Sequence, residues 1–523
     1  MRQINKRDFP ASDMARYTSN TIMCMLVALY GTLVIAFMCQ KAVPASLWAI
    51  LFAAFSAVCL LISNIGKKPV FLLPQQPDRW NGYVFGGAFA ICFLAFFVYW
   101  FAYCPGGYSS DTNNQWMQIH GMLPLNDWHP ALHTMLMGGI VALCDQLSFV
   151  VLVQGVFYAA AVGYMTATLW RWRISKLICV GNLLFLSLNP GFLNTLIFPW
   201  KDCAFAVSTL ILATQLFSAH STAGKWLKRP RKALLMGLSL CLCAILRHNG
   251  IALALAACVW LFVSFPKQLK DVGVCALCFL LLFVTIKGPI YSAAGVERKD
   301  KSLEEMCGLP LTVLAHIYVE APEALDEETT QFLETLGPRE TYVAHYRVGD
   351  WNSVKWELRE LADDSGYTLP QVFGYMIRAS MAEPQLALSA VGKLYEMSIW
   401  PVGHAYWRYS PYVDASGAQF GIVSRKHGFL SRALNWLCRM SANEALSWLV
   451  WKPGFYLLLI MLSCVLFAQR RPLSSLLMPA MLIAYHLATC VLLSSPTDFR
   501  FFLPTMMCAP IALVAITTMP QGD

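Results

Sequence analysis

The chain has 523 residues, of which 57% are hydrophobic and 13% are charged, and its mean hydropathy is +0.52. This composition excludes a soluble enzyme, and apolar runs of about 18 residues or more indicate helices that cross a bilayer. The formal charge of +9 requires no nucleic-acid partner, because the basic residues fall mainly in short connectors that orient spans and meet anionic headgroups. We therefore predict an all-α, polytopic membrane protein.

In chain order, the first twenty residues are polar and charged, unlike a signal peptide. About twelve apolar runs then follow as predicted spans, and the run 131–144 is too short for a comfortable crossing. The predicted spans are 22–39, 47–64, 84–103, 148–169, 177–190, 202–218, 233–247, 250–265, 272–290, 447–468, 473–494 and 501–518.

The run 131–144 decides the topology. If it lies at the outer interface, four basic connectors fall on the same side as the basic N-terminus, as the positive-inside rule requires. The protein is then expected to lie in the cell membrane with both termini in the cytoplasm. The lipid bilayer is one of its expected partners. The four connectors contain Arg171 to Lys176, Lys225 to Lys232, Lys267 to Lys270, and Arg470 with Arg471.

This topology divides the chain into three predicted parts. A transmembrane module, 1–290, carries an external loop over 104–146 with juxtamembrane helices. A charged and mostly helical extracytoplasmic insertion occupies 291–446, and the last spans lie in 447–523. Most cysteines fall in apolar runs as small hydrophobes, while Cys104 and Cys307 are both expected outside and could pair.

The polar groups that remain near span ends are all expected on the outer face. Ionisable residues at membrane depth are costly and usually mark function. Since four separate segments deliver them to one side, we predict a single site. These residues are Asp111, Asp127, His129, Asn189, Lys201, Asp202, Arg247, His248, Asn249, Asp498 and Arg500.

Asp111 follows a Pro-Gly-Gly turn and precedes several amides, including Asn114. A carboxylate so placed could take the proton of an acceptor hydroxyl, or hold a divalent cation such as Mg or Mn. A merely solvated carboxylate is the alternative. Asp127 and Pro130 are explained as a cap and a first-turn proline. His129 stands four residues before a second histidine, which is a weak metal signal beside ordinary hydrogen bonding.

Three cations complete the pattern. Lys201 begins a span beside Asp202, Arg247 lies in a tight turn between spans, and Arg500 follows Asp498. Capping, snorkelling and local pairing are the structural alternatives. An outward arginine nevertheless runs against the usual charge bias, and a lipid phosphate lies at this depth, where cations would bind it.

These motifs resemble those of the integral-membrane glycosyltransferases of the GT-C superfamily, in particular protein O-mannosyltransferases and aminoarabinose transferases. In those families the first large external loop carries a catalytic acid, followed by a His/Lys-Pro-Pro-Leu segment at the membrane surface. Here Asp111 is followed by His129-Pro130-Ala131-Leu132. Trp200-Lys201-Asp202 and Arg247-His248-Asn249-Gly250 are similar to the WKD and RHNG signatures of uncharacterised bacterial multi-pass proteins.

The resemblance implies a glycosyltransferase that moves a sugar from a polyprenyl-phosphate donor to an extracytoplasmic envelope glycan, lipid or protein. Asp111 would be the general base or metal ligand, His129 would shape the acceptor side, and three cations would hold the donor phosphate. A transporter or flippase of a lipid-linked or anionic precursor is one alternative, and a non-catalytic envelope assembly partner is another. The phosphate ligands would be Lys201, Arg247 and Arg500, and the supporting residues Asn114, Asp127, Asp202, His248, Asn249 and Asp498.

Overall fold

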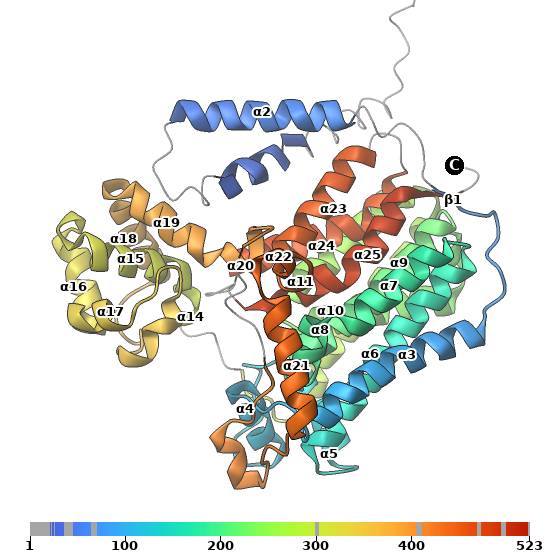
Figure 1. The fold of residues 1–523 in the computed structure, drawn as a ribbon, viewed down its shortest axis with the longest axis horizontal. Coiled ribbons are helices and arrows are strands. Elements are labelled where there is room, and N and C mark those ends of the chain that lie inside the picture. Colours follow the sequence, from blue (N-terminus) through green and yellow to red (C-terminus); the bar gives the residue numbers. More distant parts are fainter. Residues whose placement is uncertain are drawn as a thin grey trace, which may run out of the picture.

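The computed structural model describes residues 21, 24–25, 27–35, 45–63, 71–298, 303–403, 410–467, 472–492 and 498–520. Within these ranges the fold is almost wholly helical, which confirms the all-α prediction (Figure 1). One small parallel sheet in the described part pairs β1 (Phe71–Leu72) with β2 (Thr518–Met519).

The helices of the bundle are largely apolar. Six helical stretches in the described residues are long and apolar enough to cross a membrane: Gly82–Ala102 (α3), Leu147–Arg171 (α6), Lys201–Ser221 (α9), Pro266–Ala293, Leu473–Val491 and Phe499–Thr517. Pro266–Ala293 contains η2 (Pro266–Gln268), α12 (Leu269–Thr285), the π-helix η3 (Ile286–Ile290) and α13 (Tyr291–Ala293). The last two contain η9 (Leu473–Leu476) with α24 (Leu477–Leu492), and η10 (Phe499–Phe502) with α25 (Leu503–Thr517).

Two further helix pairs are bent. α7 (Lys176–Leu188) meets α8 (Pro190–Leu196) at 48°, and α22 (Glu444–Val450) meets α23 (Pro453–Phe467) at 64°. Counting each pair as one span gives up to eight within the described residues. A membrane protein is therefore supported, whereas about twelve spans are not confirmed.

Four of the other predicted spans account for the difference in number. α10 (Pro230–Leu246) has 17 residues and α11 (Gly250–Ser264) has 15, so both are short for an independent crossing. The predicted span 22–39 lies partly outside the described residues. α2 (Ala45–Ser63) is apolar along a shorter stretch, Ser46–Leu61.

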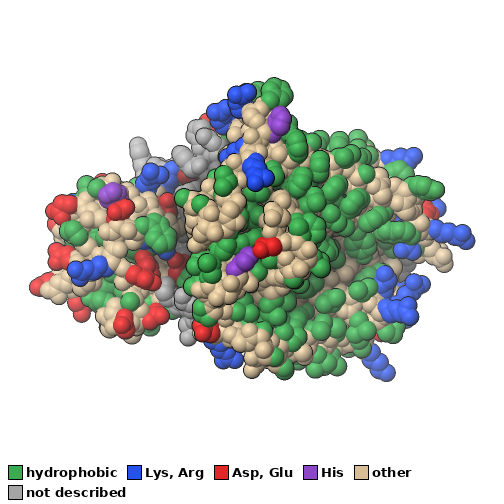
Figure 2. All heavy atoms as spheres, turned by 90° about the horizontal axis from the view of Figure 1, so that it is seen from below, with side chains coloured by type: hydrophobic (Ala, Val, Ile, Leu, Met, Phe, Trp, Pro, Cys, Tyr) green, Lys and Arg blue, Asp and Glu red, His purple; other side chains and the backbone are tan. Residues whose placement is uncertain are grey.

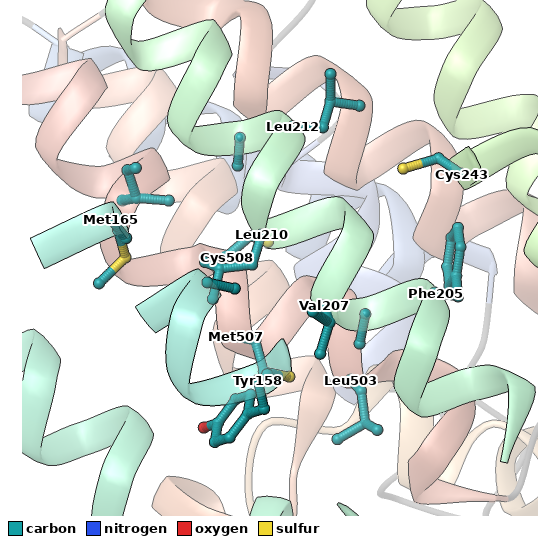
Figure 3. Packing of buried hydrophobic residues seen from close by; sticks show 14 of the residues in the cluster. Tyr158, Met165, Phe205, Val207, Leu210, Leu212, Cys243, Leu503, Met507 and Cys508 are labelled. Atoms are coloured by element: carbon teal, nitrogen blue, oxygen red, sulfur yellow. The ribbon is translucent and has the colours of Figure 1, made fainter. Parts of the chain in front are cut away.

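The core of the bundle surrounds α9. Buried side chains of α6, α9, α10 and α25 pack together there (Figure 3). In the most apolar stretch of α9, 83% of the residues are buried inside the protein. Because neighbouring helices surround α9 in this way, its first residues are held in a fixed position. The residues labelled in the figure are Tyr158, Met165, Phe205, Val207, Leu210, Leu212, Cys243, Leu503, Met507 and Cys508.

Different charged groups lie at the two ends of α9. Its 21 residues extend over about 30 Å. Lys201 begins the helix, whereas the basic 3-10 turn η1 (Lys225–Lys228) follows its far end and lies against η2. At the end of α6, Arg173 pairs with Asp78. Basic connectors thus lie away from the end of the bundle that carries Lys201.

A separate lobe lies to the left in Figure 1. Residues from Leu303 to Val391 form a hydrophobic core of their own, and charged side chains cover much of the lobe where Figure 2 shows it, in contrast to the mainly hydrophobic bundle. Its helices are α14 (Leu303–Met306), α15 (Gly308–Glu320), α16 (Glu327–Leu336), α17 (Arg339–His345), α18 (Leu369–Ala382) and α19 (Pro384–Leu394). Short turns η4 (Pro322–Ala324), η5 (Trp351–Ser353) and η6 (Lys355–Glu357) connect them.

The rest of the predicted insertion belongs to the bundle. α20 (Glu396–Ile399) packs on α23. The turn η7 (Ala415–Phe420) contacts α4 (Ser110–Ile119), and α21 (Gly428–Ser441) places Leu434 and Cys438 in the main core. The predicted range 291–446 therefore contains two structural parts. The predicted external loop, 104–146, holds the short helices α4 and α5 (Ala131–Val141), in a range where helices were expected.

Candidate active site

Asp111 lies in the first turn of α4, at one end of the bundle. The Ser109 side chain caps this helix by accepting from the Thr112 N–H, and it also accepts from Trp200 Nε1 at 2.8 Å. These contacts tie α4 to the start of α9. Asp111 Oδ2 then lies 2.9 Å from Arg500 Nη1 and 3.6 Å from Lys201 Nζ.

The Asp111 carboxyl group is ionised and has one oxygen available. Burial alone would raise its pKa, but Arg500 and Lys201 outweigh burial and hold the pKa of Asp111 well below its usual range. Oδ1 makes no hydrogen bond within the described part of the chain, and 25% of the side chain is exposed. The arrangement suits an oxygen that meets an incoming group.

His129 supports Lys201 rather than Asp111 directly. Lys201 Nζ donates to His129 Nδ1 at 2.9 Å, with the proton on the ammonium. Burial, reinforced by the Lys201 charge, lowers the pKa of His129 to about 3. The imidazole is therefore neutral near pH 7 and acts as an acceptor that orients the lysine.

Asp202 is the buried anion beneath this pair. Its side chain is 0% exposed, and its Oδ1 pairs with Arg247, whose side chain is 5% exposed. Arg500 Nε lies 3.9 Å from Asp202 Oδ2 and 2.9 Å from Asp498 Oδ2. Together with Asp111 and Lys201, the cluster contains three carboxylates and three cations, so its charges balance.

Aromatic rings fix the two guanidinium groups. The Arg500 guanidinium lies 4.3 Å from the Trp200 ring centroid and 5.3 Å from that of Phe501. Arg247 lies 4.6 Å from the Phe501 ring centroid. Such cation–π contacts hold a cation in one orientation. Sequence reasoning gave Trp200 and Phe501 no role, although each adjoins a charged residue that it selected.

A second, smaller cluster supports the loop before α5. Asp127 accepts from the Ala131 N–H at 2.9 Å, which is the predicted capping contact, and its backbone oxygen accepts from His248 Nε2 at 2.9 Å. The other carboxylate oxygen pairs with Lys287 of the π-helix η3. Sequence reasoning missed Lys287, although a single lysine inside an apolar run was a signal.

The remaining predicted residues make structural hydrogen bonds outside the Asp111 cluster. Asn249 donates to Thr489 at 2.7 Å, Asn114 accepts from Gln118 at 2.7 Å, and Asn189 caps α8. Cys104 and Cys307 are both free.

The structure also bears on a metal site. Among the residues that it describes, no group of three or more His, Cys, Asp or Glu side chains is placed to hold a metal ion. His133 Nδ1, four residues after His129, lies 3.0 Å from Gln115 Nε2.

Comparison with known proteins adds one match. Residues 118–355 match a protein family described as a family of unknown function (DUF6020). This range includes His129, Lys201, Asp202 and Arg247 but neither Asp111 nor Arg500. No curated protein and no solved structure matches the chain.

Proposed function

We propose that the protein is a GT-C-like glycosyltransferase that moves a sugar from a polyprenyl-phosphate donor to an acceptor outside the cytoplasm. The observation that carries the proposal is the contact of Asp111 with both Lys201 and Arg500, at 3.6 and 2.9 Å, from three distant segments. One carboxylate and two cations at the end of an apolar bundle match the chemistry of this transfer. In this proposal the cluster faces the exterior, both termini are cytoplasmic, and about twelve segments enter the membrane.

The proposed reaction removes a negative charge from Asp111 and adds one to the donor phosphate. The acceptor hydroxyl oxygen attacks the anomeric carbon, the bond from that carbon to the phosphate oxygen breaks, and the phosphate leaves with the electron pair. The hydroxyl proton passes to Asp111. Donor phosphate gains one negative charge as Asp111 loses one, so Lys201 and Arg500 can transfer their attraction from the carboxylate to the phosphate.

This exchange also addresses the weak basicity of Asp111. With both cations on its carboxylate, the pKa of Asp111 lies well below the usual range, which makes a poor general base. A phosphate that draws Lys201 and Arg500 away would raise that pKa. Donor binding would therefore prepare the base for the acceptor.

Arg247 has a different role in this scheme. It was predicted to be a third phosphate ligand, but its side chain is 5% exposed and pairs with Asp202. We propose that it neutralises Asp202 and thereby leaves Lys201 and Arg500 free to exchange partners. His129 keeps Lys201 aimed at the site through the 2.9 Å hydrogen bond.

The test uses the purified full-length protein in proteoliposomes. A panel of labelled polyprenyl-phosphate sugars is incubated with envelope acceptor fractions, and binding of undecaprenyl phosphate is measured by native mass spectrometry. Asp111→Asn should abolish transfer and keep the lipid phosphate bound, whereas Arg500→Gln should lose both. Glu305→Gln, at an acid in the separate lobe, is the control and should retain both. Full transfer by Asp111→Asn would refute the proposal.

One observation favours a transporter or flippase as second candidate. Transporters often place binding sites at broken helices, and the break between α22 and α23 holds Lys452, which is wholly buried 3.8 Å from Glu396. Movement of labelled polyprenyl-phosphate sugar across proteoliposomes, without covalent transfer and with loss in Lys452→Met, would favour that function.

A further inference from the structure

α21 (Gly428–Ser441) lies at the depth where a predicted span ends. The His427 N–H donates to the carbonyl of Ala102, the last residue of α3, and the Phe101 and His427 rings lie 5.6 Å apart. α21 then packs on α3, α8 and α22, and it runs across the bundle helices rather than along them (Figure 1). If α3 crosses the bilayer, α21 begins at the membrane surface.

One face of α21 is apolar and uncovered. Phe429 is 73% exposed and Trp436 is 58% exposed, and they are seven residues apart, so they share a face. Ala433, Leu437 and Met440 extend this exposed face by helical spacing. The opposite face is buried against the protein through Ser431, Leu434 and Cys438.

The edge of the apolar face is basic. Arg432 and Arg439 are also seven residues apart, and by helical geometry they adjoin Trp436. Both are exposed, and neither has an ion pair within the described residues. Arg425 and Lys426 lie just before His427, the N-cap of the helix. An apolar face with a basic edge is the pattern of a helix that lies in the headgroup region of a membrane.

We propose that α21 is a membrane-surface helix that binds anionic phospholipid. Phe429 and Trp436 enter the boundary between headgroups and acyl chains, and Arg432 and Arg439 contact the lipid phosphates. Two features select lipid as the occupant: the charge of the edge, and the packing of α21 on the apolar helix α3, where exposed Phe101 lies 5.6 Å from the His427 ring.

α21 and the segment before it brace the loop that carries Asp111. Tyr103 donates to Asn435 of α21 at 2.8 Å. The Arg425 N–H donates to the Cys104 carbonyl, and the Tyr108 N–H donates to the Tyr412 carbonyl, each at 2.8 Å. Lipid held on α21 therefore steadies Tyr103, directly before the Cys104 that precedes the Pro-Gly-Gly turn.

The experiment measures lipid binding without reference to catalysis. Full-length protein in a nonionic detergent is titrated with dioctanoyl phosphatidylglycerol, dioctanoyl phosphatidylcholine or sodium phosphate, and thermal unfolding reports the half-saturating concentration. Phosphatidylglycerol should stabilise the wild type at lower concentration than phosphatidylcholine, and sodium phosphate should have no such effect. The double variant Arg432→Gln/Arg439→Gln should raise the half-saturating phosphatidylglycerol concentration roughly 30-fold.

Matched variants distinguish the effect of losing the arginine charges from the effect of misfolding. Arg432→Lys/Arg439→Lys should keep most of the phosphatidylglycerol effect. Arg347→Gln/Arg359→Gln removes the same charge from the separate lobe and should change nothing. An unchanged half-saturating concentration in the double glutamine variant overturns the proposal. Equal stabilisation by the two lipids, or the same stabilisation by sodium phosphate, also overturns it.

Discussion

Removal of the buried carboxylate at Asp202 should be the most destabilising polar substitution in the cluster. In Asp202→Asn, Arg247 stays buried, and its side-chain partners among the described residues are then the Phe501 ring and the neutral amide. A buried charge that loses its counter-ion costs about 3–5 kcal/mol of stability. Arg247→Gln should cost less, because Arg500 Nε remains 3.9 Å from Asp202.

The assay is a double-mutant cycle. Unfolding of the full-length protein in mixed micelles is followed with increasing sodium dodecyl sulfate for the wild type, Asp202→Asn, Arg247→Gln and the double variant Asp202→Asn/Arg247→Gln, which close the cycle. The apolar pair Asp202→Leu/Arg247→Met is measured beside them. Replacement of both charges by apolar groups should be less damaging than Asp202→Asn alone, since no unpaired charge remains. The exposed pair of Asp78 and Arg173, at the other end of the bundle, is the control and should give no measurable coupling. Additive losses at Asp202 and Arg247 would refute the reasoning.

Three other predictions concern the same end of the bundle. Because the pKa of His129 is lowered to about 3, the unfolded chain binds more protons between that pH and about 6.5. Wild-type stability should therefore fall as pH decreases through this window, by up to about 1.4 kcal/mol per pH unit from His129, and His129→Gln should show a shallower fall in the same unfolding assay. Lys287→Met should slow transfer by about 10- to 100-fold because Asp127 loses its partner, while undecaprenyl phosphate binding and the Lys287→Arg variant stay near wild type. EDTA should leave the transfer rate unchanged, because Asp111 already pairs with two side-chain cations; a rate restored only by added Mg²⁺ would contradict this.

The sequence was most informative about charged residues that lie at the ends of apolar helices. Lys201 and Asp202 at the start of α9, Arg247 at the end of α10 and Arg500 before α25 were selected because charge near an apolar run is costly. The structure brings these residues to one place with Asp111. Their roles in chemistry stay predictions.

Other features depend on contacts that periodicity does not encode. Lys287 lies in the π-helix η3 and pairs with Asp127, whose loop forms backbone hydrogen bonds with Glu297. Arg500 lies close to the ring of Trp200, which directly precedes α9, as well as to that of Phe501 in its own turn η10. Apolar length predicted about twelve spans, of which up to eight are supported within the described residues; α10 and α11 are shorter helices joined by a tight turn in which Arg247 is buried.

The division of residues 303–441 between two cores has an evolutionary consequence. The lobe from Leu303 to Leu394 packs mainly on itself, whereas Tyr412 and Asp414 share backbone hydrogen bonds with Tyr108. Relatives can therefore exchange, enlarge or discard the lobe while the Tyr412 segment stays under stronger constraint. Sequence diversity is expected to accumulate in the lobe, and a minimal version of the protein would omit Leu303 to Leu394 and keep the bundle on both sides of it.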